Sequence, residues 1–354
     1  MRLPGASTAA DPSPIPGSPA PERPRARVLR TAASIAIGLG LLGFLIYHAD
    51  VDAIHEHMGE AGWAAPLILL PWIVIVCMDA LGWRCALSPA AASRVPFPSL
   101  VLVRMAGEAI NSVTPTAAVG GEAVKAQLLR GWGVPASDGL ASIVIAKTAL
   151  TVSQSVFVVI GVAALCARWQ RPGLGLALVL MLLIAVAGFT AVLVRLQRRA
   201  PATTMWGWAR RLAPRSRLLD RLAPGARAID ARLADFYGLR RDAFWRASTW
   251  YLIGWMLGVT EVALVMYLIG SPIPWLDALV IEALSQPIRA AAVVIPGGLG
   301  TQEWGGVALC RLVGIPEDEG ATLWLLKRGR ELVLDGIGLL YLAHRSGIAA
   351  ARKA

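Results

Sequence analysis

Ionisable and amide side chains recur at helical spacing inside stretches of the chain that are otherwise apolar. Two triplets share the spacing i, i+4, i+7: Arg104, Glu108 and Asn111 in the first, and Glu282, Gln286 and Arg289 in the second. Residues at this spacing lie on one face of a helix. Charged groups within an apolar segment usually face a protein interior or a wet cavity. The triplets therefore predict a buried polar site, with local helix pairs or interfacial residues as the alternative.

A second polar face follows each triplet along the chain. It contains Lys147 and Gln154 in the first case, and Lys327, Arg328, Arg330, Glu331 and Asp335 in the second. The second face is too charged to lie against lipid. Two interpretations stay open for these faces: a path for a polar substrate, and a salt-bridge network that holds the protein together.

Glycine gathers at two elbows where proline interrupts an apolar region. The first elbow, PTAAVGGE at 115–122, contains Gly120, Gly121 and Glu122, and the second, PGGLGTQE at 296–303, contains Gly297, Gly298, Gly300, Gln302 and Glu303. Such glycines let the backbone approach a ligand, and the helix after each elbow directs its positive end there. This arrangement suits a polar headgroup, whereas the alternative is that the two glutamates cap these helices.

Motifs for covalent catalysis or metal binding are missing from the sequence. It has no Gly-x-Ser-x-Gly, no candidate triad and no nucleotide fingerprint. The four cysteines are scattered without a CxxC spacing, and His55 and His57 lack the spacing of an HExxH pair. We therefore expect no metal, no cofactor and no enzymatic activity.

The composition places most of the chain in a membrane. Of 354 residues, 56% are apolar and 16% are charged, against roughly a quarter charged in a soluble domain. Six stretches approach or exceed the length of a bilayer span: 31–47, 63–81, 139–165, 173–194, 248–269 and 320–343. Two further regions, 97–132 and 275–313, are broken by Pro and Gly, and each predicts two short helices around an elbow. The predicted fold is an all-α integral membrane protein with about six transmembrane helices and two re-entrant helix pairs.

The two broken regions resemble each other in sequence. A gapless shift by 181 positions superposes identical residues: Pro115 on Pro296, Glu122 on Glu303, Leu128 on Leu309, Arg130 on Arg311, Gly133 on Gly314, Pro135 on Pro316 and Gly139 on Gly320. We predict an internal duplication, with repeat 1 at about 97–165 and repeat 2 at about 275–343. The shift also places Glu108 on Arg289, which predicts an ion pair near a pseudo-twofold axis.

The distribution of charge predicts the orientation. A net charge of +11 would indicate nucleic acid for a soluble protein, but cytoplasmic loops of membrane proteins are also rich in Lys and Arg. The loop 197–247 holds twelve Arg and four Asp, and the loop 48–62 is acidic. We place the basic loop 197–247 and both chain ends in the cytoplasm, and we place the acidic loop 48–62 outside. The broken regions then enter from opposite faces, an inverted-repeat topology found in transporters.

Three segments complete the predicted organisation. Residues 1–30 form a disordered Pro-rich cytoplasmic tail, because they lack an apolar periodicity. The membrane domain covers 31–345, and 346–354 form a short basic cytoplasmic tail. Within the basic loop, Ile229, Leu233 and Phe236 share one side of a predicted helix at 226–239, a pattern typical of a helix on the membrane surface.

Two motif regions resemble the flippase-like transmembrane region of lysylphosphatidylglycerol synthases. They are 107–130 with its Gly-Gly-Glu, and IEALSQPIRAAAVVIPGGLGTQE at 281–303 followed by KRGRE at 327–331. Within that family, the sequence is most similar to stand-alone membrane proteins associated with hopanoid biosynthesis. The resemblance extends over about 31–345, although its specific motifs occupy only the broken regions and the last span.

The resemblance implies movement of lipid rather than its synthesis. The aminoacyl-transferring activity of the synthases lies in a soluble C-terminal domain, and this chain ends about eleven residues after its last predicted span. In the hopanoid branch, the implied role is delivery of hopanoids toward the outer membrane. We expect a lipid flippase or transporter of the bacterial inner membrane. The alternatives are a membrane-embedded lipid-modifying transferase and a non-transporting scaffold of a lipid-synthesis complex. The expected partners are hopanoid or phospholipid, together with lipid-biosynthesis or export proteins, and not nucleic acid.

Overall fold

The computed structural model describes residues 66–113, 119–170, 172–212, 216–292 and 300–351. These residues form twelve helices and no strand, which confirms the predicted all-α class. The predicted tail 1–30, the first span 31–47 and the acidic loop 48–62 lie outside the described residues.

The helices follow one another with short connections. In chain order they are α3 (Leu69–Ala86), α4 (Pro89–Arg94), α5 (Phe97–Val113), α6 (Val119–Arg130), α7 (Ala136–Arg168), α8 (Pro172–Arg198), α9 (Pro201–Leu212), α10 (Arg217–Leu239), α11 (Arg241–Leu268), α12 (Trp275–Ala291), α13 (Thr301–Leu312) and α14 (Glu317–Ala351).

Four helical segments are long and apolar enough to cross a membrane. They are Pro66–Ala86, Ala136–Arg168, Gly175–Arg198 and Arg241–Leu268, and they contain or overlap four of the six predicted spans. A fifth predicted span, 320–343, lies within α14, whose 35 residues extend over about 50 Å at 1.5 Å per residue. The charges on α14 distinguish it from these four helices, and two of them, Lys327 and Arg330, are buried in the protein.

Each broken region forms a pair of helices, α5–α6 and α12–α13, as predicted. The centres of both elbows, including Gly297 and Gly298, lie outside the described residues. The predicted elbows are too long at their C-terminal ends, because α6 begins at Val119 and α13 at Thr301. Gly120, Gly121 and Glu122, and likewise Gln302 and Glu303, therefore stand in first helical turns, where a carboxylate is favourable beside the positive helix end.

Glycine and proline end and restart the helices in the same way in both regions. Gly133 and Gly314 follow α6 and α13 with φ of +73° and +91°, a left-handed conformation that terminates helices. Pro135 is the N-cap of α7, and Pro316 directly precedes α14. The matched Gly-Val-Pro and Gly-Ile-Pro sequences thus perform the same structural task.

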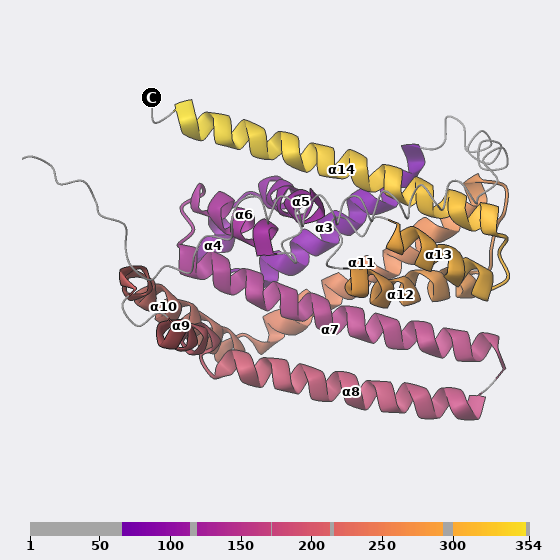
Figure 1. The fold of residues 1–354 in the computed structure, drawn as a ribbon, viewed down its shortest axis with the longest axis horizontal. Coiled ribbons are helices and arrows are strands. Elements are labelled where there is room, and N and C mark those ends of the chain that lie inside the picture. Colours follow the sequence, from indigo (N-terminus) through magenta and orange to yellow (C-terminus); the bar gives the residue numbers. More distant parts are fainter. Residues whose placement is uncertain (1–65, 114–118, 171, 213–215, 293–299, 352–354) are drawn as a thin grey trace, which may run out of the picture.

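The packing of the helices agrees with the predicted duplication. Under the shift of 181 positions, α3, α5 and α7 correspond to α11, α12 and α14. In the structure α3 packs on α11, α5 packs on α14, and α12 packs on α7. Helices of one half therefore pack on helices of the other, and the contacts of α5 with α14 and of α12 with α7 are equivalent. Figure 1 shows that α7 and α14 begin at opposite ends of the molecule, with α5–α6 near one end and α12–α13 near the other.

The basic loop folds into two helices, and one expectation about it is wrong. Leu233 and Phe236 of α10 are buried in a core shared with α7, and Ile229 packs against this core. The apolar side of α10 therefore faces the protein rather than a membrane surface. Its packing on α7 and α8 supplies the apolar contact that the sequence pattern had assigned to lipid.

The two larger apolar cores leave a polar layer between them. Along α11, Tyr251 belongs to one core and Val259 to the other. Between these positions, Gly254, Trp255 and Gly258 line a cavity. The absent side chains of the two glycines leave room beside α11 at the level where the charged residues gather.

Candidate functional site

The polar layer surrounds a cavity of about 280 Å³. Its walls come from α3, α5, α7, α11, α12 and α14, so both predicted repeats contribute. Eleven charged residues line it: Asp79, Arg104, Glu108, Lys147, Glu261, Glu282, Arg289, Lys327, Arg330, Glu331 and Asp335. The structure thereby brings together nine residues that the sequence placed on the polar faces, namely Arg104, Glu108, Lys147, Glu282, Arg289, Lys327, Arg330, Glu331 and Asp335.

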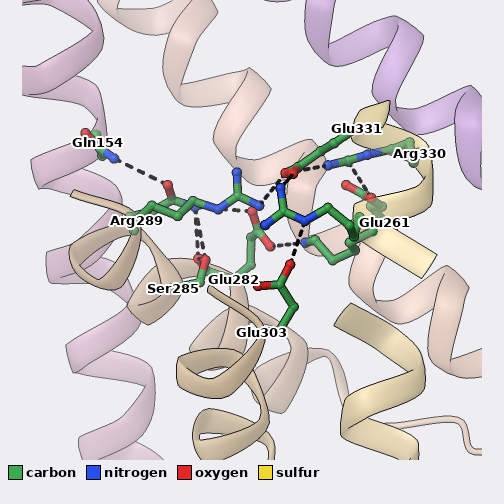
Figure 2. Close-up of polar contacts among 11 residues, drawn as sticks. Gln154, Glu261, Glu282, Ser285, Arg289, Glu303, Arg330 and Glu331 are labelled. Carbon is green, nitrogen blue, oxygen red and sulfur yellow. Dashed lines mark hydrogen bonds and ion pairs between the residues drawn. The ribbon is translucent and has the colours of Figure 1, made fainter. Parts of the chain in front are cut away.

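Glu331 of α14 is the centre of an ionic network on one side of this cavity (Figure 2). Its carboxylate accepts hydrogen bonds from Arg289 of α12 at 3.0 Å and from Arg328 at 2.7 Å. A nitrogen of Arg330 lies 3.5 Å from the same carboxylate. One glutamate therefore contacts three guanidinium groups on two helices, which fixes the position of α14 beside the end of α12.

Three cations near the middle of α14 also bond carboxylates other than Glu331. Lys327 bonds Glu282 at 2.6 Å. Arg328 also bonds Glu303 at 2.5 Å, and Arg330 bonds Glu261 of α11. The side chains of Lys327 and Glu303 are only 2% and 1% exposed, and an unpaired charge at such depth is strongly destabilising. These pairs connect α11, α12, α13 and α14, as expected for the salt-bridge interpretation.

A chain of amides connects this network to α7. Gln154 of α7 donates to Gln286 of α12 at 3.3 Å, and Gln286 donates to the Glu282 carboxylate at 3.3 Å. Figure 2 shows Gln154 at the far end of this chain, on the helix that crosses beside α12. Two predicted site residues, Gln154 and Gln286, are thus joined across the two repeats.

The α5–α6 side of the site has a separate set of ion pairs. Lys125 of α6 bonds Glu108 of α5 at 2.7 Å and Glu122 at 3.2 Å, while Arg104 bonds Asp79 of α3. Glu108, Lys125 and Lys147 also line a smaller cavity of about 40 Å³. The first repeat therefore satisfies its glutamates locally, through a lysine that the second repeat lacks.

Close packing of α5 on α6 positions these groups. A Cβ at Gly121 would collide with the carbonyl oxygen of Gly107 and with Asn111. Without it, the Gly121 N–H donates to the Asn111 side-chain oxygen at 2.8 Å. Gly121 and Asn111, both predicted site residues, thus act by holding the helix pair together.

Lys147 differs from its counterpart in the other repeat. Arg328, at the equivalent position, bonds Glu303 and Glu331. Lys147 is exposed toward both cavities. Among the described side chains, no carboxylate lies within ion-pair distance of it. The equivalent of Glu303 is Glu122, which Lys125 engages instead, so Lys147 presents a free ammonium group to the cavity.

The predicted ion pair between Glu108 and Arg289 is wrong. Glu108 bonds Lys125, and Arg289 bonds Glu331. Both residues line the same cavity, but each has a partner on a helix of its own repeat. Local partners therefore replace the predicted contact across the axis.

Sequence reasoning missed three members of the site, Asp79, Glu261 and Lys125. Asp79 and Glu261 stand inside apolar spans, and an isolated carboxylate at membrane depth is itself a signal of a polar interior. Lys125 lies on the short helix α6, one turn after Glu122, and this i, i+3 spacing was the available signal.

Gly300 belongs to the second predicted elbow and is among the described residues. It is the N-cap of α13 and has a φ of +75°.

Comparison with protein families identifies this set of helices. The family model for the lysylphosphatidylglycerol synthase TM region matches residues 31–337. The chain belongs to this family. The match includes the cavity-lining residues of α3 through α14 and thereby indicates a multi-pass membrane protein with a lipid-related function. No curated protein matches the chain significantly, and no solved structure does. The finer resemblance to hopanoid-associated proteins stays a prediction.

Proposed function

We propose that the protein is a lipid flippase or transporter of the bacterial inner membrane. The transported lipid is hopanoid or a related polar lipid, and it moves toward the outer leaflet or the outer membrane. The observation that carries this proposal is the central cavity, in which charged residues from both predicted repeats meet between two apolar cores. Transporters with inverted repeats hold their substrates at such an interface.

The cavity suits a headgroup because its cations and carboxylates are mostly matched. A network of this kind offers hydrogen-bond donors and acceptors without a large net charge, so a polar group can enter without displacing an ion pair. Lys147 adds a donor that no neighbouring carboxylate occupies in the described structure. We therefore assign headgroup binding to Lys147, and we assign the position of the cavity walls to the network around Glu331.

The rest of the proposal follows from charge and family. Both chain ends lie in the cytoplasm, as the basic loops predict. The partners are membrane lipids and proteins of lipid biosynthesis or export. The protein acts as a transporter rather than an enzyme and uses no metal or cofactor. Membership of the lipid-related family supports this choice over nucleic-acid binding.

Proteoliposomes test the proposal directly. The purified protein is reconstituted with fluorescent phospholipids or with a labelled hopanoid, and dithionite quenching measures the rate at which lipid crosses the bilayer. Wild-type protein is expected to accelerate translocation of at least one of these lipids. Lys147→Gln is expected to lose this acceleration, and Lys147→Arg is expected to keep part of it. An unchanged rate for every lipid overturns the proposal, and appearance of a modified lipid supports a transferase instead.

A further inference from the structure

A second cavity opens beside the central one, between α7, α8 and α12. Its volume is about 390 Å³, within the range of about 300–1,000 Å³ that is usual for ligand pockets. Most of its wall is apolar and consists of Val158 and Val159 of α7, Leu182, Val186 and Phe189 of α8, and Pro287 and Ala290 of α12. Its polar side consists of Thr151, Gln154, Ser155 and Gln286. We call this cavity the lateral groove.

The lateral groove lies where hydrocarbon surrounds the protein. The α8 span Gly175–Arg198 is strongly apolar, and no residue of its most apolar 18-residue stretch is buried inside the protein. In Figure 1, α8 runs beside α7 along the edge of the molecule. Ile184, which points away from the groove, is 74% exposed. The groove therefore opens among the hydrocarbon chains of the bilayer.

Polarity changes in order along the face of α7 that leads from the central cavity to the groove. Lys147 lines the central cavity. Thr151, Gln154 and Ser155 follow at spacings of four, seven and eight residues and line the groove, so they lie on the same helical face. Val158 continues this face with an apolar side chain. The sequence of cation, uncharged polar groups and hydrocarbon is the order of groups in a lipid molecule.

The two cavities share a wall. Gln286 lines the groove, bonds Gln154 at 3.3 Å and also bonds Glu282, which lines the central cavity. Three residues further along α12, Arg289 belongs to the central cavity, whereas Pro287 and Ala290 belong to the groove. The Gln154–Gln286 hydrogen bond thus lies between the lateral groove and the central cavity.

We infer that the lateral groove holds a hydrocarbon chain of the lipid whose headgroup occupies the central cavity. The lipid enters sideways from the bilayer between α8 and α12, and its headgroup passes the Gln154–Gln286 pair to reach Lys147. This inference rests on the proposed transport function and adds to it the binding site and entry route of the apolar part. It also explains why α7 has a polar stripe that continues beyond the ionic network.

Filling the groove tests the inference. Ala290→Phe adds a ring to an exposed position on the α12 wall, and Ser155→Phe adds one on the α7 wall. Ile184→Phe adds the same ring on the outer side of α8 and is the matched control. Each filling variant is expected to displace about two buried methylene groups, which weakens lipid binding roughly tenfold. Gel filtration and thermal unfolding show which variants are folded.

Two readouts separate this inference from the transport proposal. The first is native mass spectrometry of protein equilibrated with dioleoyl phosphatidylglycerol, which measures retained lipid without transport. Wild type and Ile184→Phe are expected to retain one lipid with equal affinity, and the filling variants are expected to need about ten times more lipid to reach the same retention. The second is the translocation rate of the same protein samples. Equal retention by a folded filling variant, or no retention by wild type, overturns the groove assignment. Retention without translocation overturns transport and keeps the groove as a lipid site.

Discussion

Replacing Glu331 by glutamine is the sharpest test of the ionic network. The substitution removes one negative charge and keeps the shape of the side chain. Arg328 retains Glu303, and Arg330 retains Glu261. Arg289 loses the carboxylate with which it forms its ion pair. The expected consequence is therefore one uncompensated guanidinium group rather than three.

The exposure of Arg289 sets the magnitude. Removing one partner of a fully buried ion pair costs about 3–5 kcal/mol. The Arg289 side chain is 29% exposed to the cavity, where water screens part of its charge, so we expect Glu331→Gln to lower the free energy of unfolding by about 2–3 kcal/mol. Glu317→Gln is the control, because its ion pair with Arg311 is exposed and such pairs contribute about 0–1 kcal/mol.

These differences in the free energy of unfolding are measured by titrating sodium dodecyl sulfate into mixed micelles. Tryptophan fluorescence reports the unfolded fraction. A double-mutant cycle with Arg289→Gln adds a second criterion. The double variant buries no uncompensated charge from this pair, so it is expected to recover most of the stability that Glu331→Gln loses. If Glu331→Gln unfolds like Glu317→Gln, or if the double variant is as unstable as the sum of the single ones, the network does not hold the helices as argued.

Three further predictions concern packing, topology and pH. A Cβ at Gly161 would meet α12, whereas one at Gly188 meets no atom within 4 Å, so Gly161→Val should destabilise the protein by about 1–3 kcal/mol and Gly188→Val should not, as detergent unfolding will show. In a cysteine-free background, single cysteines at Arg211 and Asp318 should react with impermeant maleimide from opposite faces of the membrane; labelling from one face contradicts the inverted topology. Burial raises the pKa of Tyr237 to about 12 from its ordinary value of 10. Its neutral form therefore stabilises the folded state fully below pH 10, and this contribution is lost as the pH rises toward 12, a loss that Tyr237→Phe should abolish in unfolding measured against pH.

The helical framework could be predicted because its signals are local. Long apolar stretches gave the spans within α7, α8 and α11, and Gly-x-Pro sequences marked where α7 and α14 begin. The ends of the elbows were less predictable. Glycine is compatible with both a helix and a turn, so Gly120 and Gly121 gave no reliable sign that α6 begins at Val119.

The pairing of charges could not be predicted from spacing alone. Which carboxylate meets Arg289 depends on the separation and rotation of α12 and α14, and neither is encoded in the period of one helix. The same limit applies to α10, whose apolar side fits equally well on a membrane or on α7. Only the packed structure decides that Leu233 is buried in the protein.

The predicted duplication explains why the site is central, and a departure from it explains why the site is open. Lys147 and Arg328 occupy equivalent positions on α7 and α14, which belong to different predicted repeats. In the second repeat, the position equivalent to Lys125 is Gly306, and a Cβ there would already overlap the Trp324 ring. No cation can therefore compete for Glu303 at that place, and Arg328 bonds it. In the first repeat Lys125 takes Glu122, which leaves the ammonium group of Lys147 available to a ligand. One lysine-for-glycine difference thus accounts for the unpaired ammonium group of Lys147, to which we assign headgroup binding, while the backbone framework of the two halves stays the same.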